Sequence, residues 1–489
     1  MASRAAAPLP PLKTGTGPRS ALVLVGHGSH LSPDSSAPVY ACADRIRALG
    51  VFDEVAEAFW KEEPSLRDAL DLVTAERVWV VPLFLAEGYF TRIVVPRELG
   101  IEGEVTFRSE REIRYCPPIG THPAMAEMIL RRAREVTGRG TGKPKECALL
   151  VIGHGTERSP TSGGTVYSLV EKLRASSEFR TVDCGFLDEP PHVADVLATI
   201  DAPDIVLVPF FVAEGWHTRT TIPEDLGLTG NLTIRGGRRI WYTPPVGTLD
   251  EVPDVVLAIA ADAGAPLRPS TIHGPRAAGA SELHDARRAF LDWVDEAGPA
   301  GRTFLQLHIQ PTPDLRYEVR NSADSGVPSA ELSRRGSERT RELARSTAEG
   351  QYRPLRYAGD LPRGWIVPDL DADALCAVVA ELYPGAVLHW YRGRVDGLRL
   401  VPYPEWAARQ TGIYSDLGLL PPALVEEAVD GCCAARHCLR TRLWDRGPSD
   451  GAAIGEGSVP CTEPCTLFAS AAREILHGQG QRLVTVPSS

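Results

Sequence analysis

The chain has 489 residues, of which 43% are hydrophobic and ten are cysteines, and its formal net charge is −11. This length predicts about three domains, and the apolar content is sufficient for folded cores. We expect no nucleic-acid partner, because a surface this acidic repels a polyanion. We also expect a cytoplasmic protein with no membrane partner, since no apolar run approaches the ~20 residues of a spanning helix.

Residues 1–19 contain Pro, Gly and Ala but no continuous apolar core, and they predict a disordered lead. After this lead, a segment of about one hundred residues occurs twice without gaps. From His27 to His154, and at every matched position that follows, the offset is 127 residues. A match that keeps register through strands, helices and loops indicates a duplicated folding unit. The exception is Phe90, whose counterpart is His217.

Each copy alternates strand-like and helical segments. Strands are expected at 21–25, 55–59, 77–85 and 111–115, and at 205–212 for the central strand of the second copy. Continuous apolar runs are typical of parallel strands that helices cover on both faces. We therefore expect an α/β fold with two tandem parallel-sheet lobes, over 20–140 and 145–263. In such sheets, ligands bind beyond the carboxyl ends of the strands.

The remainder of the chain differs in composition. Residues 264–281 are rich in Pro, Gly and Ala and predict a linker. An α+β region of unknown fold is expected over 282–425, with a helix at 281–297 and strand-like pieces at 303–309 and 386–390. The last part, 426–489, carries a cysteine cluster that two helical segments, 423–429 and 467–477, flank.

Polar side chains follow three strands of the second copy. His154 lies in a Gly-His-Gly turn, Glu189 follows the second strand, and Glu214 with His217 follows the central strand. Histidine and carboxylate side chains at one sheet edge can hold a divalent ion and accept protons. The alternative for a single Gly-His-Gly turn is that glycine makes the turn and histidine only caps it.

These motifs occur in the order strand-Gly-His-Gly-Ser/Thr, Phe-Leu-x-Glu-x-Pro and Pro-x-Phe-x-x-Glu-Gly-x-His. In this order they resemble the CbiX-type class II chelatases, the sirohydrochlorin cobalto- and ferrochelatases. The resemblance implies a lyase of the metal chelatase type that inserts Co²⁺ into sirohydrochlorin without ATP, in cobalamin biosynthesis. The family's paired catalytic histidines correspond to His154 and His217 and its metal-side acid to Glu189, and the same three residues would contact the metal.

The residue types suit that chemistry, because two pyrrole N–H protons must leave the macrocycle as the metal enters. The substrate carries many carboxylates, so Arg219 and Thr156 are candidate substrate-binding residues, with Arg92 and Arg238 as further anchors. A solvated surface position is the alternative for each arginine. Because Phe90 removes its second histidine, the first copy is not expected to be catalytic.

Five of the ten cysteines lie between positions 432 and 465. The spacing of Cys432, Cys438, Cys461 and Cys465 resembles the cluster motif of sirohaem-containing reductases and the C-terminal iron–sulfur region of some CbiX-type proteins. We expect these four residues to bind a 4Fe-4S cluster, with Cys433 as the alternative to Cys432. A structural zinc site and unligated buried thiols are the competing interpretations.

Two functional alternatives remain open at this point. The first is insertion of Fe²⁺ for sirohaem, because histidine and glutamate serve both ions. The second is a non-catalytic tetrapyrrole- or metal-binding redox sensor. The sequence also leaves the oligomeric state open, a homodimer included.

Overall fold

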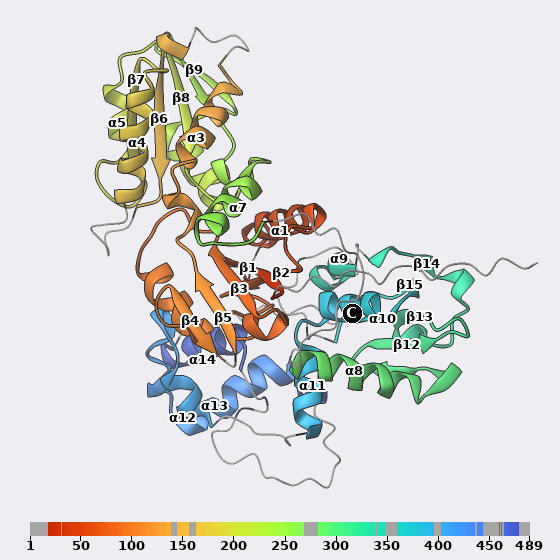
Figure 1. Ribbon diagram of the computed structural model, residues 1–489. Coiled ribbons are helices and arrows are strands. Elements are labelled where there is room, and N and C mark those ends of the chain that lie inside the picture. Colours follow the sequence, from red (N-terminus) through yellow and green to blue (C-terminus); the bar gives the residue numbers. More distant parts are fainter. Residues whose placement is uncertain are drawn as a thin grey trace, which may run out of the picture.

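The structure is a computed structural model of the chain (Figure 1). It describes residues 18–30, 32–108, 110–137, 144–155, 163–267, 282–337, 340–347, 352, 357, 359–395, 402–435, 438–443, 459, 461 and 464–478. The expected disordered lead, except its last two residues, and most of the expected linker lie outside this part of the chain.

The first lobe is a five-stranded sheet in the order β2-β1-β3-β5-β4. Its strands are β1 (Ser20–Gly26), β2 (Glu54–Phe59), β3 (Arg77–Pro82), β4 (Val105–Arg108) and β5 (Arg111–Tyr115). All neighbouring pairs are parallel except β4 with β5 at the edge. Every residue of β1 is buried, which is why this strand has no polar alternation. The helices of this part are α1 (Ala37–Leu49) and α2 (Val95–Leu99).

The second lobe repeats the same plan, in the order β7-β6-β8-β10-β9. Its elements are β6 (Cys147–Gly153), α4 (Gly164–Ser176), β7 (Thr181–Phe186), α5 (Val193–Thr199), β8 (Asp204–Pro209), α6 (Ile222–Leu226), β9 (Leu232–Arg235) and β10 (Arg238–Tyr242). The prediction of two α/β lobes is confirmed, with one antiparallel edge strand added to each sheet.

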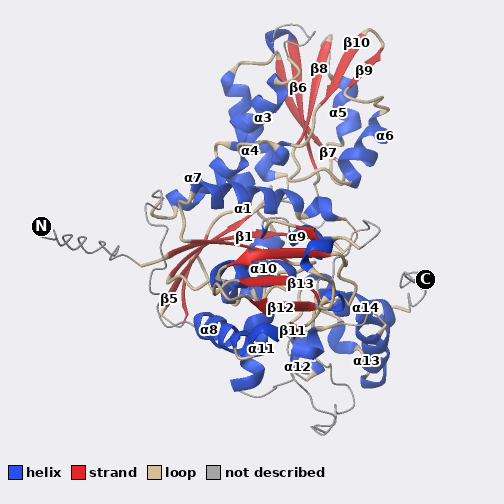
Figure 2. Cartoon of the chain, turned by 90° about the vertical axis from the view of Figure 1, so that its right-hand side faces the viewer, coloured by secondary structure: helices blue, strands red, loops and turns tan. Residues whose placement is uncertain are grey.

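The last helix of each repeat packs on the other lobe. α3 (Met125–Arg134), from the first repeat, packs against α4 and β8, and α7 (Val252–Asp262), from the second, packs against α1 and β3. Figure 2 shows α7 and α1 at the level between the two sheets. The Arg132 side chain, on α3, donates to the Pro245 carbonyl at 2.9 Å and to the Thr248 hydroxyl at 2.7 Å. One hydrophobic core therefore runs through both lobes.

A third, mixed sheet follows in the order β11-β12-β13-β15-β14. The elements of this region are α8 (Glu282–Asp295), β11 (Arg302–Phe304), β12 (Leu307–Pro311), β13 (Tyr317–Asn321), β14 (Ser333–Arg334), α9 (Thr340–Arg345), β15 (Trp365–Leu370), α10 (Ala372–Leu382) and α11 (Ala386–Val395). The strand expected at 386–390 is wrong, because these residues begin α11. That helix packs against α8, and the ring centroids of Trp390 and Phe290 are 5.7 Å apart. The short apolar run therefore belongs to a buried helix, which sequence periodicity does not distinguish from a buried strand.

The C-terminal helices are α12 (Tyr403–Ala408), α13 (Pro422–Val429) and α14 (Thr466–Leu476). They lie beneath the first lobe, on the side away from the second (Figure 1). Their core also contains the buried side chains of Cys432 and Cys461. Within the described residues, no single helix is long and apolar enough to cross a membrane; α10 and α11, bent by 99°, pass that test only as a pair.

Candidate functional site

A cleft of about 910 Å³ is formed by residues of both lobes at the carboxyl ends of their strands. The first lobe contributes Trp60 and the loop after β3, from Phe84 to Phe90. The second lobe contributes the Gly153–Gly155 turn and the loop after β8, and Gly412 and Ile413 come from the C-terminal region. The walls are mostly apolar and aromatic, as is usual for a site that binds a flat organic ligand.

His154 lines this cleft, and the ring of His217 packs against the His154 ring. Their ring centroids are 4.7 Å apart and the rings are nearly perpendicular, at 79°. His154 follows β6 directly, and His217 opens a single π-helical turn that leads into α6. The structure therefore brings together the two histidines that the sequence analysis paired, across 63 residues of chain.

The electrostatic settings of the two rings differ. Burial lowers the pKa of His217 below its usual value, and His154 lowers that pKa further, while Asp188 opposes the shift. The Nδ1 atom of His217 is buried and has no hydrogen-bond partner among the described residues. Nδ1 of His154 contacts the Gly155 carbonyl oxygen at 2.9 Å. In the tautomer that donates there, Nε2 carries a free lone pair.

Asp188 is a neighbour of the histidine pair that the sequence analysis did not single out. Its Oδ2 lies 3.3 Å from Nδ1 of His154, and both side chains are about half exposed. Asp188 immediately precedes Glu189, so the available signal was an acidic pair after the second strand. Only the three-dimensional turn selects the member of that pair that contacts His154.

Glu189 lies against the backbone next to His154. A Cβ atom added to Gly155 would stand 2.6 Å from Cγ of Glu189, and one added to Gly163 would stand 2.6 Å from its Oε1. The Glu189 side chain therefore fills the space under the turn, and glycine at both positions makes room for it. In the first lobe, the equivalent Glu62 accepts a hydrogen bond from the Ser29 backbone N–H at 3.3 Å.

The predicted substrate-binding residues differ in where they lie and in what they contact. Arg219 bonds to Glu214 on its own lobe and to Asp34 on the first lobe, both at 2.9 Å. This arginine is exposed and bridges the two lobes. Arg238 donates to the Ile200 carbonyl at 2.9 Å, at the beginning of its strand and thus away from the carboxyl ends. Thr156 lies outside the described residues.

The first lobe keeps His27 and Glu62 but replaces the other residues around the histidine site. The same offset of 127 residues puts Trp60, Lys61 and Phe90 opposite Leu187, Asp188 and His217. His27 packs against Trp60 and Phe90, with ring centroids 5.3 and 5.7 Å away. Burial lowers the pKa of His27; its hydrogen bond to Gly28 opposes the shift, and Lys61 adds to it. His27 is thus part of an aromatic cluster.

The C-terminal cysteines gather beside the first lobe, where Cys465 lines a small cavity together with Trp60. A hydrogen bond with Cys432, and then burial, raises the pKa of the Cys465 thiol well above its usual value. Burial, and then Cys465, raises the pKa of Cys438 to about 11. The contact between Cys432 and Cys465 favours Cys432 over Cys433 as a ligand. Among the described residues, no group of three such side chains is close enough to hold a single ion.

A buried cation accompanies these thiols. Arg440 is 4% exposed. Burial opposes its charge, but Glu63 and Asp68, with Cys461 as a smaller contributor, raise the pKa of Arg440 above its usual value. Its guanidinium reaches Asp68 at 3.2 Å and Glu63 at 3.5 Å, both on the first lobe. Four soft thiol donors, largely shielded from water and next to a fixed positive charge, fit an anionic iron–sulfur cluster.

Comparisons with known proteins agree with this geometry. The CbiX family model matches residues 21–136 and 148–263. The DR2241 stabilising domain matches residues 285–394, and the 4Fe-4S iron-sulfur cluster binding domain matches residues 395–474. A probable sirohydrochlorin cobaltochelatase of Halobacterium salinarum is 47% identical over 271 residues, which are 50% of this chain and 92% of that relative.

Two further relatives extend the comparison. A sirohydrochlorin cobaltochelatase of Methanopyrus kandleri is 31% identical over 140 residues, covering 24% of this chain and 97% of the relative. The crystal structure of DR2241 from Deinococcus radiodurans superposes with a TM-score of 0.77 at 29% identity, covering 94% of this chain and all of that one. It is reported as a multi-domain protein with structural similarity to chelatases and two additional novel domains.

Two α/β lobes enclose an apolar cleft that His154 lines, with His217 packed against His154, and together with the relatives this identifies a metal chelatase, a class of lyase. The chain belongs to the CbiX family, with a DR2241 stabilising domain and a 4Fe-4S cluster binding domain after the two lobes. Only one of its two lobes keeps both histidines.

Proposed function

We propose that this protein inserts Co²⁺ into sirohydrochlorin without ATP, as a step of cobalamin biosynthesis in the cytoplasm. The observation that carries the proposal is the contact of His217 with His154, which lines the two-lobed cleft. The names of the Halobacterium and Methanopyrus relatives support the substrate and the metal.

The metal is a substrate of this reaction, so the protein has to hold it and then release it. Two neutral imidazoles suit Co²⁺ and leave most of its coordination positions open for the macrocycle. Because the pKa of His217 is lowered, this ring stays neutral to a lower pH than an ordinary histidine does. A buried ring nitrogen without a hydrogen-bond partner, such as Nδ1 of His217, costs free energy. A metal ion or a pyrrole N–H would supply that partner.

The departing pyrrole protons need acceptors close to the metal. We propose His217 as one such base, because its partly buried imidazole is neutral and lies beside His154. Glu189 supplies the second acceptor in this proposal, and its packing under Gly155 ties its carboxylate to the turn that carries His154. Asp188 lies 3.3 Å from Nδ1 of His154 and helps to orient that ring.

The cleft accommodates the macrocycle between the two lobes. Aromatic walls from Phe84, Phe90 and Phe211 suit a flat conjugated ring, because offset and edge contacts between rings are favourable. In this proposal Arg219 and Thr156 bind the peripheral carboxylates of the substrate. Arg219 would then exchange Glu214 or Asp34 for a substrate carboxylate.

We further propose that Cys432, Cys438, Cys461 and Cys465 bind one 4Fe-4S cluster. The family match to residues 395–474 and the hydrogen bond between Cys432 and Cys465 support this assignment, and all four thiols pack in or against one hydrophobic core. Such a cluster would supply one-electron chemistry and would link α13 to α14. Anaerobic purification should give a brown protein with about four irons per chain, and a colourless protein with bound zinc would contradict it.

An anaerobic absorbance assay of sirohydrochlorin with Co²⁺, and separately with Fe²⁺, tests the chelatase proposal. Wild type should accelerate Co²⁺ insertion over the reaction without protein, and His217→Ala should remove most of that acceleration. The matched control is His192→Ala, because His192 is an exposed histidine of the same lobe. Faster insertion of Fe²⁺ would move the assignment to a ferrochelatase. Binding of the tetrapyrrole without insertion of either ion would contradict the enzyme and favour a sensor.

A further inference from the structure

Trp60 borders two cavities of the protein at once. It lines the large cleft, and with Tyr414 and Cys465 it also lines a cavity of about 20 Å³ on the side of the cysteines. The same side chain packs against the core of the first lobe and against the core that contains the cysteines. A single indole ring thus separates the proposed cluster site from the proposed substrate site.

Tyr414 connects this indole with the helix that follows Cys465. The Tyr414 and Trp60 ring centroids are 5.6 Å apart, at an interplanar angle of 50°. The Tyr414 hydroxyl lies 2.9 Å from the Ser470 hydroxyl on α14, whose N-cap is Cys465. The preceding residue, Ile413, lines the cleft, and its carbonyl accepts a hydrogen bond from Arg473 of α14 at 2.7 Å.

On the cleft side, the ring contacts continue to Phe90. The Trp60 and Phe90 centroids are 5.0 Å apart in an edge-to-face arrangement, and Phe90 itself lines the cleft. The Lys61 ammonium lies over both Trp60 and Tyr414, 4.2 and 4.0 Å from their ring centroids. A cation in this position holds the two rings together.

The aromatic chain is specific to the first lobe. In the second lobe, the positions of Trp60, Lys61 and Phe90 are held by Leu187, Asp188 and His217, of which none is aromatic except the imidazole of His217. The first lobe has aromatic rings at two of these positions, and Trp60 borders the cavity at Cys465. A structural role as filler would need apolar bulk there, but not a continuous row of conjugated rings.

We propose that Trp60 and Tyr414 carry one electron from the cysteine cluster to a metal ion in the cleft. This inference rests on the cluster and on the cleft proposed above. A reduced 4Fe-4S cluster loses one electron, and a trivalent ion in the cleft gains it and becomes divalent, with no bond made or broken. A small low-potential electron carrier reduces the cluster again. The step has a chemical purpose, since divalent ions exchange ligands far faster than trivalent Co³⁺ does.

A single-turnover experiment tests this path on the full-length protein with its cluster. The protein is reduced with dithionite, freed of excess reductant and mixed anaerobically with the ferric complex of sirohydrochlorin. Freeze-quenched electron paramagnetic resonance follows oxidation of the cluster, and absorbance follows reduction of the tetrapyrrole iron. Wild type should show both changes together in one fast phase. Trp60→Leu should lose that phase, although it retains its iron and binds the ferric complex.

Matched variants separate the path from the shape of the cleft. Phe84→Leu also removes a ring from the cleft wall, but Phe84 does not line the cavity at Cys465, so the fast phase should remain. Tyr414→Phe keeps the ring and should keep the phase, whereas Tyr414→Leu should lose it. The two Tyr414 variants test the electron path even if Trp60→Leu fails to fold.

The outcomes distinguish the inference from the proposals beneath it. A wild-type rate in Trp60→Leu and Tyr414→Leu would overturn the path, as would equal loss in Phe84→Leu. An intact cluster that never reduces the bound ferric complex would overturn it too, while the chelatase proposal stands. A protein without the resonance signal of a reduced cluster would overturn the cluster assignment and the path together.

Discussion

His27 and His154 occupy equivalent turns, yet their chemistry is set by three neighbouring positions. In the second lobe the neighbours are an acid and a second imidazole, and the proposed function assigns His154 the roles of base and ligand on that basis. In the first lobe the neighbours are two aromatic rings and a lysine, which bury the imidazole and disfavour its protonated form. Side-chain identity at those positions therefore sets the chemical environment of each histidine.

The coupling of the two imidazoles leads to a residue-scale prediction. Burial and, after it, His154 lower the pKa of His217. In the metal-free protein, His154→Ala removes that neighbour and exposes the remaining ring, so the pKa of His217 should rise toward the ordinary histidine value. Titration by nuclear magnetic resonance measures it. The control His192→Ala should leave this pKa unchanged, and an unshifted His217 in His154→Ala would contradict the coupling.

A reciprocal substitution should restore a metal site in the first lobe. The double variant Lys61→Asp, Phe90→His gives His27 the acid and the imidazole that His154 has. Binding of Co²⁺, measured by anaerobic equilibrium dialysis, should rise from about one to about two ions per chain. The control Lys61→Ala, Phe90→Leu opens similar space without ligands and should stay at about one. Equal binding by both variants would show that these positions do not determine the site.

At the scale of elements, the loops that form the cleft are held by turns with no room for a side chain. After β10, the Pro-Pro-Val-Gly turn brings Gly247 against the backbone of Val212, where an added Cβ would collide with the Val212 carbonyl. The first lobe repeats this with Gly120 and Leu85. These contacts fix the segment after β8 that leads to His217, so the turn positions the histidine without touching it.

A substitution at this turn should therefore impair both folding and catalysis. Gly247→Ala forces the Val212 segment outward and should lower the free energy of unfolding by about 1–3 kcal/mol, as overpacking does. It should also reduce the rate of metal insertion, because His217 moves relative to His154. Urea unfolding and the absorbance assay measure the two effects. Gly164→Ala is the control, since an added Cβ there meets nothing within 4 Å; equal effects of the two variants would refute the argument.

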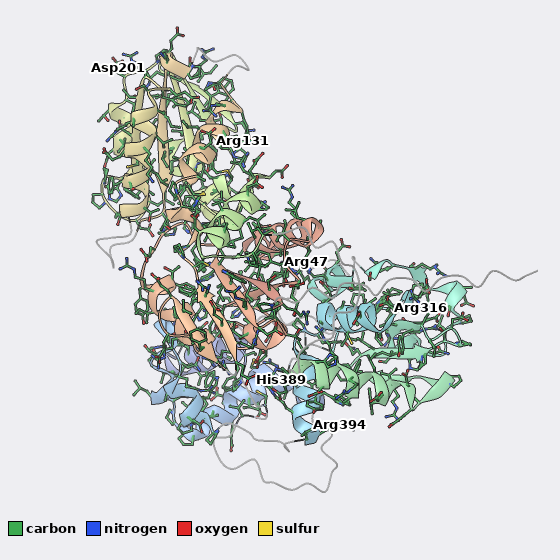
Figure 3. All side chains as sticks on the ribbon, in the orientation of Figure 1. Arg47, Arg131, Asp201, Arg316, His389 and Arg394 are labelled. Carbon is green, nitrogen blue, oxygen red and sulfur yellow. The ribbon has the colours of Figure 1, made fainter. Side chains whose placement is uncertain are left out.

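At the scale of the whole molecule, a buried ionic network joins the C-terminal region to the first lobe. Arg440 bonds to Asp68 and Glu63, and His389 of α11 lies 3.5 Å from Asp68. Burial raises the pKa of Glu63. The positive charge of Arg440 opposes this shift and keeps it from being larger. Figure 3 shows His389 where the C-terminal region meets the first lobe, and Arg316 far out on the third sheet.

Removing the buried cation should destabilise the whole assembly. Arg440→Met leaves Asp68 and Glu63 without their partner, and we expect a loss of about 3–5 kcal/mol in the free energy of unfolding. Arg316→Met breaks an exposed pair with Asp369 and should cost less than about 1 kcal/mol. Anaerobic urea unfolding compares them. If the triple variant Arg440→Met, Asp68→Leu, Glu63→Gln recovers none of the loss, the network is not the cause.

Several features could be predicted from sequence because they depend on local pattern. The apolar runs of β1 and β6, and the register of the repeat, were enough to place the two lobes and the histidine turns. The segment at 386–390 was misassigned because a short apolar run does not distinguish a strand from a buried helix. Asp188 was missed because two adjacent acids are equivalent in sequence until the turn orients them. The roles of Glu189, Arg219 and Thr156 remain predictions.

The sequence by itself determined the duplicated α/β lobes, the loss of the second histidine in the first copy and the clustering of the cysteines, because spacing and residue type carry that information. Only the tertiary structure decided the exchange of α3 and α7 between the lobes, and the contact of Trp60 with Tyr414 across 354 residues of chain. Such contacts depend on which buried surfaces meet once the lobes have formed, and no local pattern encodes that choice.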